Sequence, residues 1–140
     1  MKILEVLTRA RRLGNVGERI AARALKKEGY KVLKRNFVAT DAEIDIICEN
    51  KTTLAFVEVK TRTVGRENPR ELRPASAVTP DKQRKIISAA NQFLATREKG
   101  KRVRLDIVEV YLDGKGRKSR VVHIENAFNR NTANKGNYYR

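Results

Sequence analysis

Two strand-like runs that follow one another closely, Glu43–Glu49 and Leu54–Thr63, constrain the fold more than any other feature of the sequence. Both runs are rich in β-branched residues, and only residues 50–53 separate them. Such a pair predicts an antiparallel β-hairpin, although the connection lacks the Asn-Gly pair that most often closes tight turns. We take the hairpin to close through a two-residue turn at residues 51–52.

That turn decides which side chains of the hairpin lie opposite each other. Counting back from it places Asp45 directly opposite Glu58, with their Cβ atoms roughly 4.5–5.5 Å apart. Because side chains alternate along a strand, Lys60 lies on the same face as Glu58. A slip of one residue would move Asp45 to the other face, so the interpretation depends on the turn.

Asp45 and Glu58 both interrupt apolar runs. Charge in the interior of a central strand is unfavourable unless it is paired or bound to metal. Two carboxylates at this distance repel each other, and a divalent cation between them removes the conflict. The alternative is that both line a solvated face, where Lys60 forms a weak surface ion pair. A Glu-x-Lys pattern alone is too common to decide between the two.

The remaining sequence alternates between helical and strand patterns. We predict a short helix over 3–13 that stops at Gly14, a helix over about 16–28, a strand over Tyr30–Val38, a helix from Pro80 to about residue 97, and strands over Arg102–Leu112 and Arg120–Glu125. The helix at Pro80 has Thr79 as its N-cap and Asp81 near the positive end of its dipole. The order α-β-β-β-α-β-β predicts an α/β fold (α+β mixed), a central mixed β-sheet flanked by helices.

A chain of 140 residues fits one domain of ordinary size, so residues 1–140 are expected to form a single domain. Residues 1–14 are an N-terminal extension. Residues 64–78 are rich in Gly, Arg, Pro and Asn and have no helical or strand period, which predicts a mobile loop. Residues 129–140 are polar and are expected to form a frayed tail.

The chain is strongly basic, with 32 Lys and Arg residues against 16 Asp and Glu residues and a formal net charge of +16. A charge of that size repels itself in the folded state, and a polyanionic partner is its usual explanation. Neutralised phosphates release counterions and so supply affinity that does not depend on sequence. We therefore expect a nucleic-acid partner, against the alternative of a merely soluble or ribosome-associated basic protein.

The chain has few soft metal ligands, since Cys48 is its only cysteine and His123 its only histidine. An intramolecular disulfide and a cysteine-based zinc site are therefore excluded. Any metal must be held by oxygen atoms, which favours a hard cation, Mg²⁺ or Mn²⁺. No stretch has the apolar length of a signal peptide core or a membrane span, so we expect a cytoplasmic protein without membrane contact.

Several short motifs together resemble one known family. They are Gly17-Glu18, Gly29-Tyr30, Arg35-Asn36, Glu43-Ile44-Asp45, Phe56-Val57-Glu58-Val59-Lys60 and Arg104-Leu105-Asp106. From about residue 14 to residue 110 the chain resembles the YraN/UPF0102 family. That family is placed among the PD-(D/E)XK nucleases and is described as endonucleases distantly related to archaeal Holliday-junction resolvases. The resemblance implies a restriction-endonuclease-like core in a single nuclease-like domain.

The resemblance also implies roles for individual residues. Asp45 and Glu58 would be metal ligands and Lys60 the catalytic lysine, while Glu18 would complete the acidic cluster as a further ligand. Glu18 shares a helical face with neighbouring apolar residues, which favours an inward position. The alternative is that Glu18 belongs to a capping box in the first turn of the helix over 16–28, where it would stabilise the helix by ~1 kcal/mol.

Basic residues near the predicted site are candidates for phosphate contacts, which position a substrate without reading its sequence. Lys82 lies near a helix N-terminus, which favours anions. The simpler interpretation is a solvated lysine in the basic run over 82–85. The other candidates are Arg62, Arg66, Arg70, Arg73, Arg84 and Lys85.

Together these features predict a Mg²⁺- or Mn²⁺-dependent endonuclease that cuts phosphodiester bonds of nucleic acid, DNA rather than RNA, in linear or branched form. One alternative is a nucleic-acid-binding module that has the nuclease fold but no turnover. The other is an RNA- or ribosome-associated basic protein in which the carboxylates are incidental. A homodimer also stays open, because junction resolvases work as dimers, although the sequence contains no clear dimer patch.

Overall fold

The structure, a computed structural model, describes residues 3–64, 78–97 and 99–134. Its elements are α1 (Ile3–Lys27), β1 (Lys31–Val38), β2 (Glu43–Glu49), β3 (Thr53–Thr63), α2 (Pro80–Leu94), β4 (Arg102–Leu112), β5 (Lys118–Ile124) and α3 (Arg130–Asn134). The predicted order of helices and strands is confirmed as far as β5. No helix within the described residues is long and apolar enough to cross a membrane.

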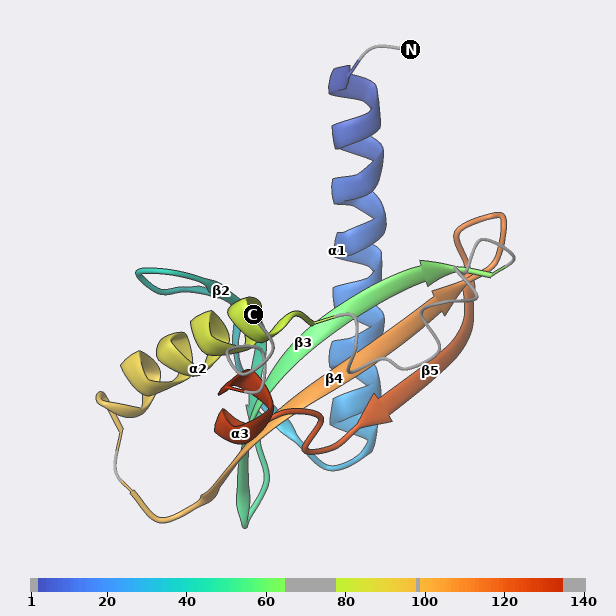
Figure 1. Cartoon of the computed structure of the whole chain (residues 1–140). Helices are drawn as coiled ribbons and strands as arrows, with labels where there is room; N and C mark the ends of the chain where they lie inside the picture. Colours follow the sequence, from blue (N-terminus) through green and yellow to red (C-terminus); the bar gives the residue numbers. More distant parts are fainter. Residues whose placement is uncertain (1–2, 65–77, 98, 135–140) are drawn as a thin grey trace.

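The five strands form one mixed sheet in the spatial order β1-β2-β3-β4-β5 (Figure 1). Strands β1, β2 and β3 pair antiparallel as a meander, β3 and β4 pair in parallel, and β4 and β5 are antiparallel. The parallel pair requires a crossover connection, and α2 lies in that connection. This arrangement confirms the predicted fold class and is consistent with a restriction-endonuclease-like core.

Each face of the sheet is covered by a different helix, because the alternation of side chains gives each face its own apolar set. One core contains Ala21 and Leu25 of α1 against Val57 of β3 and Val108 of β4. The α2 side forms a separate core around Phe56 and the apolar residues of α2. Figure 1 shows α1 passing behind β3 and β4. The sheet therefore separates an α1 side from an α2 side.

Helix α1 is continuous from Ile3 to Lys27. The predicted stop at Gly14 and the predicted helix start near residue 16 are therefore wrong. An isolated glycine lowers helix stability by about 1 kcal/mol, which a long helix packed on a sheet can absorb. Gly17 has a packing role instead, since a Cβ atom there would collide with Oγ1 of Thr61 and lie 3.1 Å from its Cβ.

The end of α2 and the C-terminal segment also differ from the sequence-based expectation. Helix α2 ends at Leu94 rather than near 97, and the Thr96 hydroxyl donates to the carbonyl oxygen of Phe93 at 2.7 Å. The expected frayed tail over 129–140 is wrong for its first part, because Arg130–Asn134 forms helix α3. Packing of α3 against α2 explains its order. Residues 135–140, and residues 65–77 of the predicted loop over 64–78, lie outside the described residues.

Candidate active site

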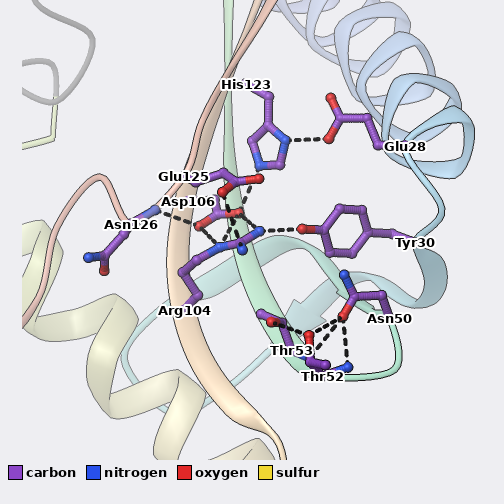
Figure 2. Close-up of polar contacts among 10 residues, drawn as sticks. All are labelled: Glu28, Tyr30, Asn50, Thr52, Thr53, Arg104, Asp106, His123, Glu125 and Asn126. Atoms are coloured by element: carbon purple, nitrogen blue, oxygen red, sulfur yellow. Dashed lines mark hydrogen bonds and ion pairs between the residues drawn. The ribbon is translucent and has the colours of Figure 1, made fainter.

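The register between β2 and β3 is the one that a two-residue turn requires. The ladder pairs Glu49 with Leu54 and continues to Ile46 opposite Val57. Around the turn, Asn50 Oδ1 accepts hydrogen bonds from the backbone amides of Thr52 and Thr53 (Figure 2). This side-chain turn supplies the tight closure that an Asn-Gly pair usually provides.

Continued by one residue, the same register places Asp45 opposite Glu58, and the charge of Glu58 raises the pKa of Asp45. The backbone ladder ends at Ile46 and Val57, and beyond it the amide of Val59 donates to Asp45 Oδ2 at 2.8 Å. The Asp45 carboxylate thus takes the place of a backbone acceptor on the neighbouring strand. This bond holds the carboxylate beside Glu58 instead of leaving it free to turn toward solvent.

The surroundings of Asp45 change its pKa strongly. Burial and the charge of Glu58 raise the pKa of Asp45 from 3.8 to about 7, with a further contribution from the charge of Glu18. The hydrogen bond from Val59 lowers this pKa but does not offset the increase. Ionisation of Asp45 is therefore disfavoured near neutral pH, and a cation beside its oxygens would favour the ionised form.

Glu58 is surrounded by cations although its side chain is only 6% exposed. Lys82 Nζ of α2 lies 3.0 Å from Glu58 Oε1, and Lys60 Nζ lies 3.7 Å from the same atom. Lys82 stands in the first turn of α2, whose N-cap Thr79 accepts a hydrogen bond from the Lys82 amide. Two basic side chains and a helix N-terminus therefore converge on the carboxylate pair.

The pair opens into a cleft of about 430 Å³ on the α2 side of the sheet. Its lining residues are Asp41, Ala42, Glu43, Asp45, Glu58, Asp81, Lys82 and Lys85. The cleft mixes carboxylates with two lysines, so it can hold both a cation and an anionic group. That combination suits a metal-bound phosphate better than either ion alone.

Glu18 comes near this site but has different partners. Arg35 Nη2 lies 3.5 Å from Glu18 Oε2, and the Asn36 amide, turned with its nitrogen toward them, lies within hydrogen-bonding distance of Glu18 and Glu43. Within the described residues, no three His, Cys, Asp or Glu side chains group closely enough to hold a metal. The capping-box interpretation of Glu18 is wrong, because Glu18 lies well inside α1.

The donor atoms of Asp45 and Glu58 fit a hard divalent cation. Mg²⁺ keeps several of its waters and commonly takes only one or two carboxylates from the protein, with substrate phosphate as a further ligand. A pair of carboxylates meets that requirement, whereas it offers none of the nitrogen or sulfur ligands that zinc prefers. The arrangement supplies part of a coordination sphere rather than a closed cage.

The structure separates the predicted phosphate contacts into different groups. Lys82 and Lys85 line the cleft, and Lys85 Nζ also lies 3.4 Å from Asp81. Arg84 turns to α3, where its Nη1 donates to the carbonyl oxygen of Ala133 at 2.7 Å. Arg62 Nε lies 3.7 Å from Glu109 Oε2. The remaining candidates, Arg66, Arg70 and Arg73, lie outside the described residues.

A second cluster of ionisable side chains, on the α1 side of the sheet, was not predicted from the sequence (Figure 2). Asp106 is fully buried and accepts hydrogen bonds from Arg104 Nε at 2.8 Å and from the Asn126 amide at 2.9 Å. His123 lies between two carboxylates, with Nε2 2.7 Å from Asp106 Oδ2 and Nδ1 2.7 Å from Glu28 Oε2. The cluster joins the end of α1 to β4 and β5.

The partners in this cluster explain how its charges are tolerated. Burial opposes the charge of His123, but hydrogen bonds to Asp106 and Glu28 outweigh burial and raise the His123 pKa. Burial likewise opposes ionisation of Asp106, yet hydrogen bonds from His123 and Arg104 leave its pKa below the usual value. Arg104 and Asp106 lie two residues apart on β4, whereas no local signal in the sequence links His123 to Glu28. Asp106 and His123 find their hydrogen-bond partners within the cluster, which therefore has a structural role.

Comparison with known proteins identifies relatives over most of the chain. Residues 17–110 match the model of the "Uncharacterised protein family UPF0102". A UPF0102 protein of Desulfosudis oleivorans is 45% identical over 129 residues, which cover 91% of this chain and 98% of that protein. A UPF0102 protein of Caldanaerobacter subterraneus subsp. tengcongensis is 44% identical over 118 residues, covering 83% of this chain and 93% of that protein.

Among solved structures, the Pyrococcus furiosus SfsA in complex with Ca²⁺ superposes with a TM-score of 0.34 at 17% identity. The match covers 83% of this chain and 63% of that chain. The family model and the relatives at 45% and 44% identity are sufficient by themselves. The chain belongs to the uncharacterised protein family UPF0102.

Proposed function

We propose that the protein is a Mg²⁺- or Mn²⁺-dependent endonuclease that hydrolyses phosphodiester bonds of nucleic acid, with DNA favoured over RNA. One observation carries the proposal: Asp45 and Glu58 lie opposite each other on adjacent strands, with Lys60 and Lys82 around Glu58. A carboxyl group whose pKa is strongly raised, as that of Asp45 is, and that lines a cleft is typical of a functional site. The resemblance to PD-(D/E)XK nucleases assigns the same three residues of β2 and β3.

The carboxylate oxygens of Asp45 and Glu58 would hold the cation, and Glu18 would act on the pair through its charge. A bound cation of this kind supplies an activated water at neutral pH and neutralises charge on the phosphate. The amide of Val59 keeps Asp45 in position, which preserves the geometry that the reaction needs. Burial of Glu58 strengthens each electrostatic contact made there.

The two lysines would handle the substrate rather than the metal. Lys60, on the same strand face as Glu58, can orient the attacking water or meet the charge that develops on a non-bridging phosphate oxygen. Lys82 is half exposed at the mouth of the cleft, where its side chain can leave Glu58 for a phosphate. The positive end of the α2 dipole lies at the same mouth of the cleft and favours an anion there.

The whole-chain charge and composition support a polyanionic substrate. A net charge of +16 provides sequence-independent attraction to phosphates. The proposal extends to a cytoplasmic location and to DNA in linear or branched form. The proposal is compatible with a homodimer, the assembly in which junction resolvases work.

A second candidate function is a nucleic-acid-binding module without turnover. The 3.0 Å ion pair between Lys82 and Glu58 favours it, because a lysine can neutralise a buried carboxylate in place of a metal. The engagement of Glu18 by Arg35 points in the same direction, since it leaves only two carboxylates together. Such a module would bind nucleic acid equally well with and without a divalent cation.

The decisive experiment measures cleavage of labelled linear DNA, branched DNA and RNA by purified protein with Mg²⁺, with Mn²⁺ and with EDTA. We expect cleavage only with a divalent cation. Asp45→Asn and Lys60→Ala should each lower the rate on the order of 10²–10³-fold, the usual effect of removing one preorganised electrostatic contact. The matched control is Asp41→Asn, which changes an exposed carboxylate of the same cleft outside the pair.

Each alternative predicts a different result. Cleavage that survives in Asp45→Asn would falsify the assignment of the carboxylate pair. Metal-independent binding without cleavage on every substrate supports the binding module. Co-purified RNA together with unchanged RNA binding in Asp45→Asn supports a non-enzymatic basic protein.

A further inference from the structure

A groove lies between α1 and the edge strand β5, on the α1 side of the sheet. It has a volume of about 420 Å³. Ile20, Ala24 and Val121 form its apolar floor, and Arg23, Lys27 and Lys118 stand at its rim. Residues 20, 23, 24 and 27 share one face of α1 because they are three or four positions apart. The helix and the strand thus place cations on both walls of one groove.

No ion pair balances the rim cations in the part of the chain that the structure describes. Within the described residues, none of Arg23, Lys27 and Lys118 pairs with a carboxylate. The carboxylates nearest in sequence are already engaged, Glu28 with His123 at 2.7 Å and Asp113 with Arg117 at 3.1 Å. Like charges gathered in this way destabilise the protein unless an anion occupies the groove.

Arg120 also lines the groove, but its guanidinium is stacked on an aromatic ring. Its guanidinium lies 4.2 Å from the ring centroid of Tyr111, its partner across the strands. A stacked arginine is held by the aromatic face and is less able to move to a ligand. Three exposed cations therefore remain available at the groove rim: Arg23, Lys27 and Lys118.

The groove is separate from the candidate active site. The residues that line the active-site cleft come from β2, β3, α2 and the segment before β2, whereas the groove is built from α1 and β5. Helices α1 and α2 belong to different apolar cores on opposite faces of the sheet. A ligand in the groove therefore leaves the Asp45–Glu58 pair accessible.

We propose that this groove binds the sugar-phosphate backbone of a nucleic acid, without a metal ion and without the Asp45–Glu58 pair. Cations on two facing walls can contact successive phosphates, and the apolar floor can accommodate the sugars between them. Such contacts position a strand without reading its sequence. The groove would thus hold one segment of nucleic acid on the face opposite the site proposed to cut.

A nucleic acid fits the groove better than an anionic membrane surface does. Proteins that lie on membranes insert large apolar side chains from a protruding amphipathic surface. The large hydrophobic side chains exposed in the described structure are Val38, Val64 and Val103, and none of them lines the groove. A concave surface with cations along its rim suits a sugar-phosphate backbone that lies along the groove.

The test measures the affinity for fluorescein-labelled duplex DNA by anisotropy over a series of salt concentrations in EDTA, where cleavage plays no part. The variant Arg23→Gln/Lys118→Gln removes one cation from each wall. We expect it to bind on the order of tenfold more weakly at low salt, with a salt slope smaller by about 1.8, since each phosphate contact contributes about 0.9. Lys27→Gln should lower the slope by about half as much.

The matched control is Lys31→Gln/Lys34→Gln, which removes the same charge from the exposed positions of β1 at the far edge of the sheet. Its affinity and salt slope should stay close to those of the unmodified protein. Equal losses in both double variants would overturn the proposal, because diffuse charge would then explain binding. So would an unchanged affinity for DNA in the groove variant. Loss of binding to phosphatidylserine vesicles, with DNA binding intact, would assign the groove to a membrane surface instead.

The outcome does not depend on catalysis. The endonuclease proposal can fail while the groove still binds DNA in EDTA, and the groove can fail while Asp45→Asn still abolishes cleavage. Thermal unfolding of both double variants checks that folding is unchanged, as expected for exposed side chains.

Discussion

At the scale of single residues, Asp45 is where function and stability conflict. Its carboxylate is held against Glu58 by the Val59 amide, and its pKa is raised to about 7, mainly by burial and then by the charge of Glu58. Because the folded protein disfavours the ionised form of Asp45, this carboxyl group lowers the stability of the metal-free protein at neutral pH. Strain of this kind is common where binding matters more than stability.

The first stability prediction follows from that conflict. In EDTA at about pH 8, Asp45→Asn should raise the free energy of unfolding by about 2–4 kcal/mol, because each pKa unit corresponds to about 1.36 kcal/mol. The unfolded chain ionises Asp45 freely above its ordinary value of 3.8, whereas the folded protein resists ionisation up to about 7. The increase in the free energy of unfolding caused by Asp45→Asn should therefore become smaller as the pH falls toward 4.

Urea unfolding at several pH values checks this prediction, with Asp41→Asn as the control because that side chain is exposed in the same cleft. Asparagine keeps an oxygen that can accept the Val59 hydrogen bond, so geometry is largely preserved. A loss of stability in Asp45→Asn at about pH 8 would contradict the assigned direction of the pKa shift.

At the scale of elements, the contact between α1 and β3 depends on Gly17. A Cβ atom at this position would collide with Oγ1 of Thr61 and lie 3.2 Å from its Cγ2. The absence of a side chain lets the helix approach the strand that carries Glu58 and Lys60. The same approach brings Glu18, the next residue of α1, close enough to raise the pKa of Asp45.

Replacing Gly17 by alanine should therefore destabilise the protein by about 1–3 kcal/mol, the usual effect of overpacking. The direction is informative, because alanine in a helix interior is otherwise more favourable than glycine by about 1 kcal/mol. The double variant Gly17→Ala/Thr61→Ala should recover most of the loss. Urea unfolding of both single variants and of the double variant gives a double-mutant cycle, which measures the interaction between residues 17 and 61. Additive losses would show that the two residues are not in contact.

At the scale of the whole molecule, two ionisable clusters lie on opposite faces of one sheet. Burial and the charge of Glu58 disfavour ionisation of Asp45, whereas the cluster around His123 favours the charged imidazolium. Both effects make the metal-free protein more stable in mildly acidic solution than above neutrality. Asp106, Glu49 and Asp113 act in the other direction, because their pKa values are lowered and their contributions are lost as the pH falls through those values.

The variant His123→Gln should isolate the contribution of the His123 cluster. The folded pKa of His123 is raised above 6.5, so its stabilisation is fully present below pH 6.5 and is lost as the pH rises through the folded value. We expect the variant to lose about 1.5–3 kcal/mol at about pH 5.5, as for hydrogen bonds to charged groups, and less at about pH 9. Thermal unfolding in EDTA measures the profile, with the exposed Ser119→Ala on β5 as control. An equal loss at both pH values would exclude a titrating role.

The sequence was informative wherever the relevant contacts are local. The turn at residues 51–52 and the period of two along β2 and β3 were enough to place Asp45 opposite Glu58, because a hairpin register follows from its turn. Helix α2 was predicted from its cap because Thr79 acts within one turn. Glycine at residue 14 misled, because α1 runs through it without a break and ends at Lys27.

By itself, then, the sequence determined the order of the elements, the hairpin register that joins two carboxylates, and a charge that calls for a polyanion. Only the tertiary structure decided that Glu18 is held by Arg35, that His123 joins Glu28 to Asp106, and that α1 and β5 enclose a basic groove. The physical reason is distance along the chain. Turns and strand alternation encode neighbours within one element or hairpin, whereas the approach of a helix to a sheet depends on close packing of many side chains together.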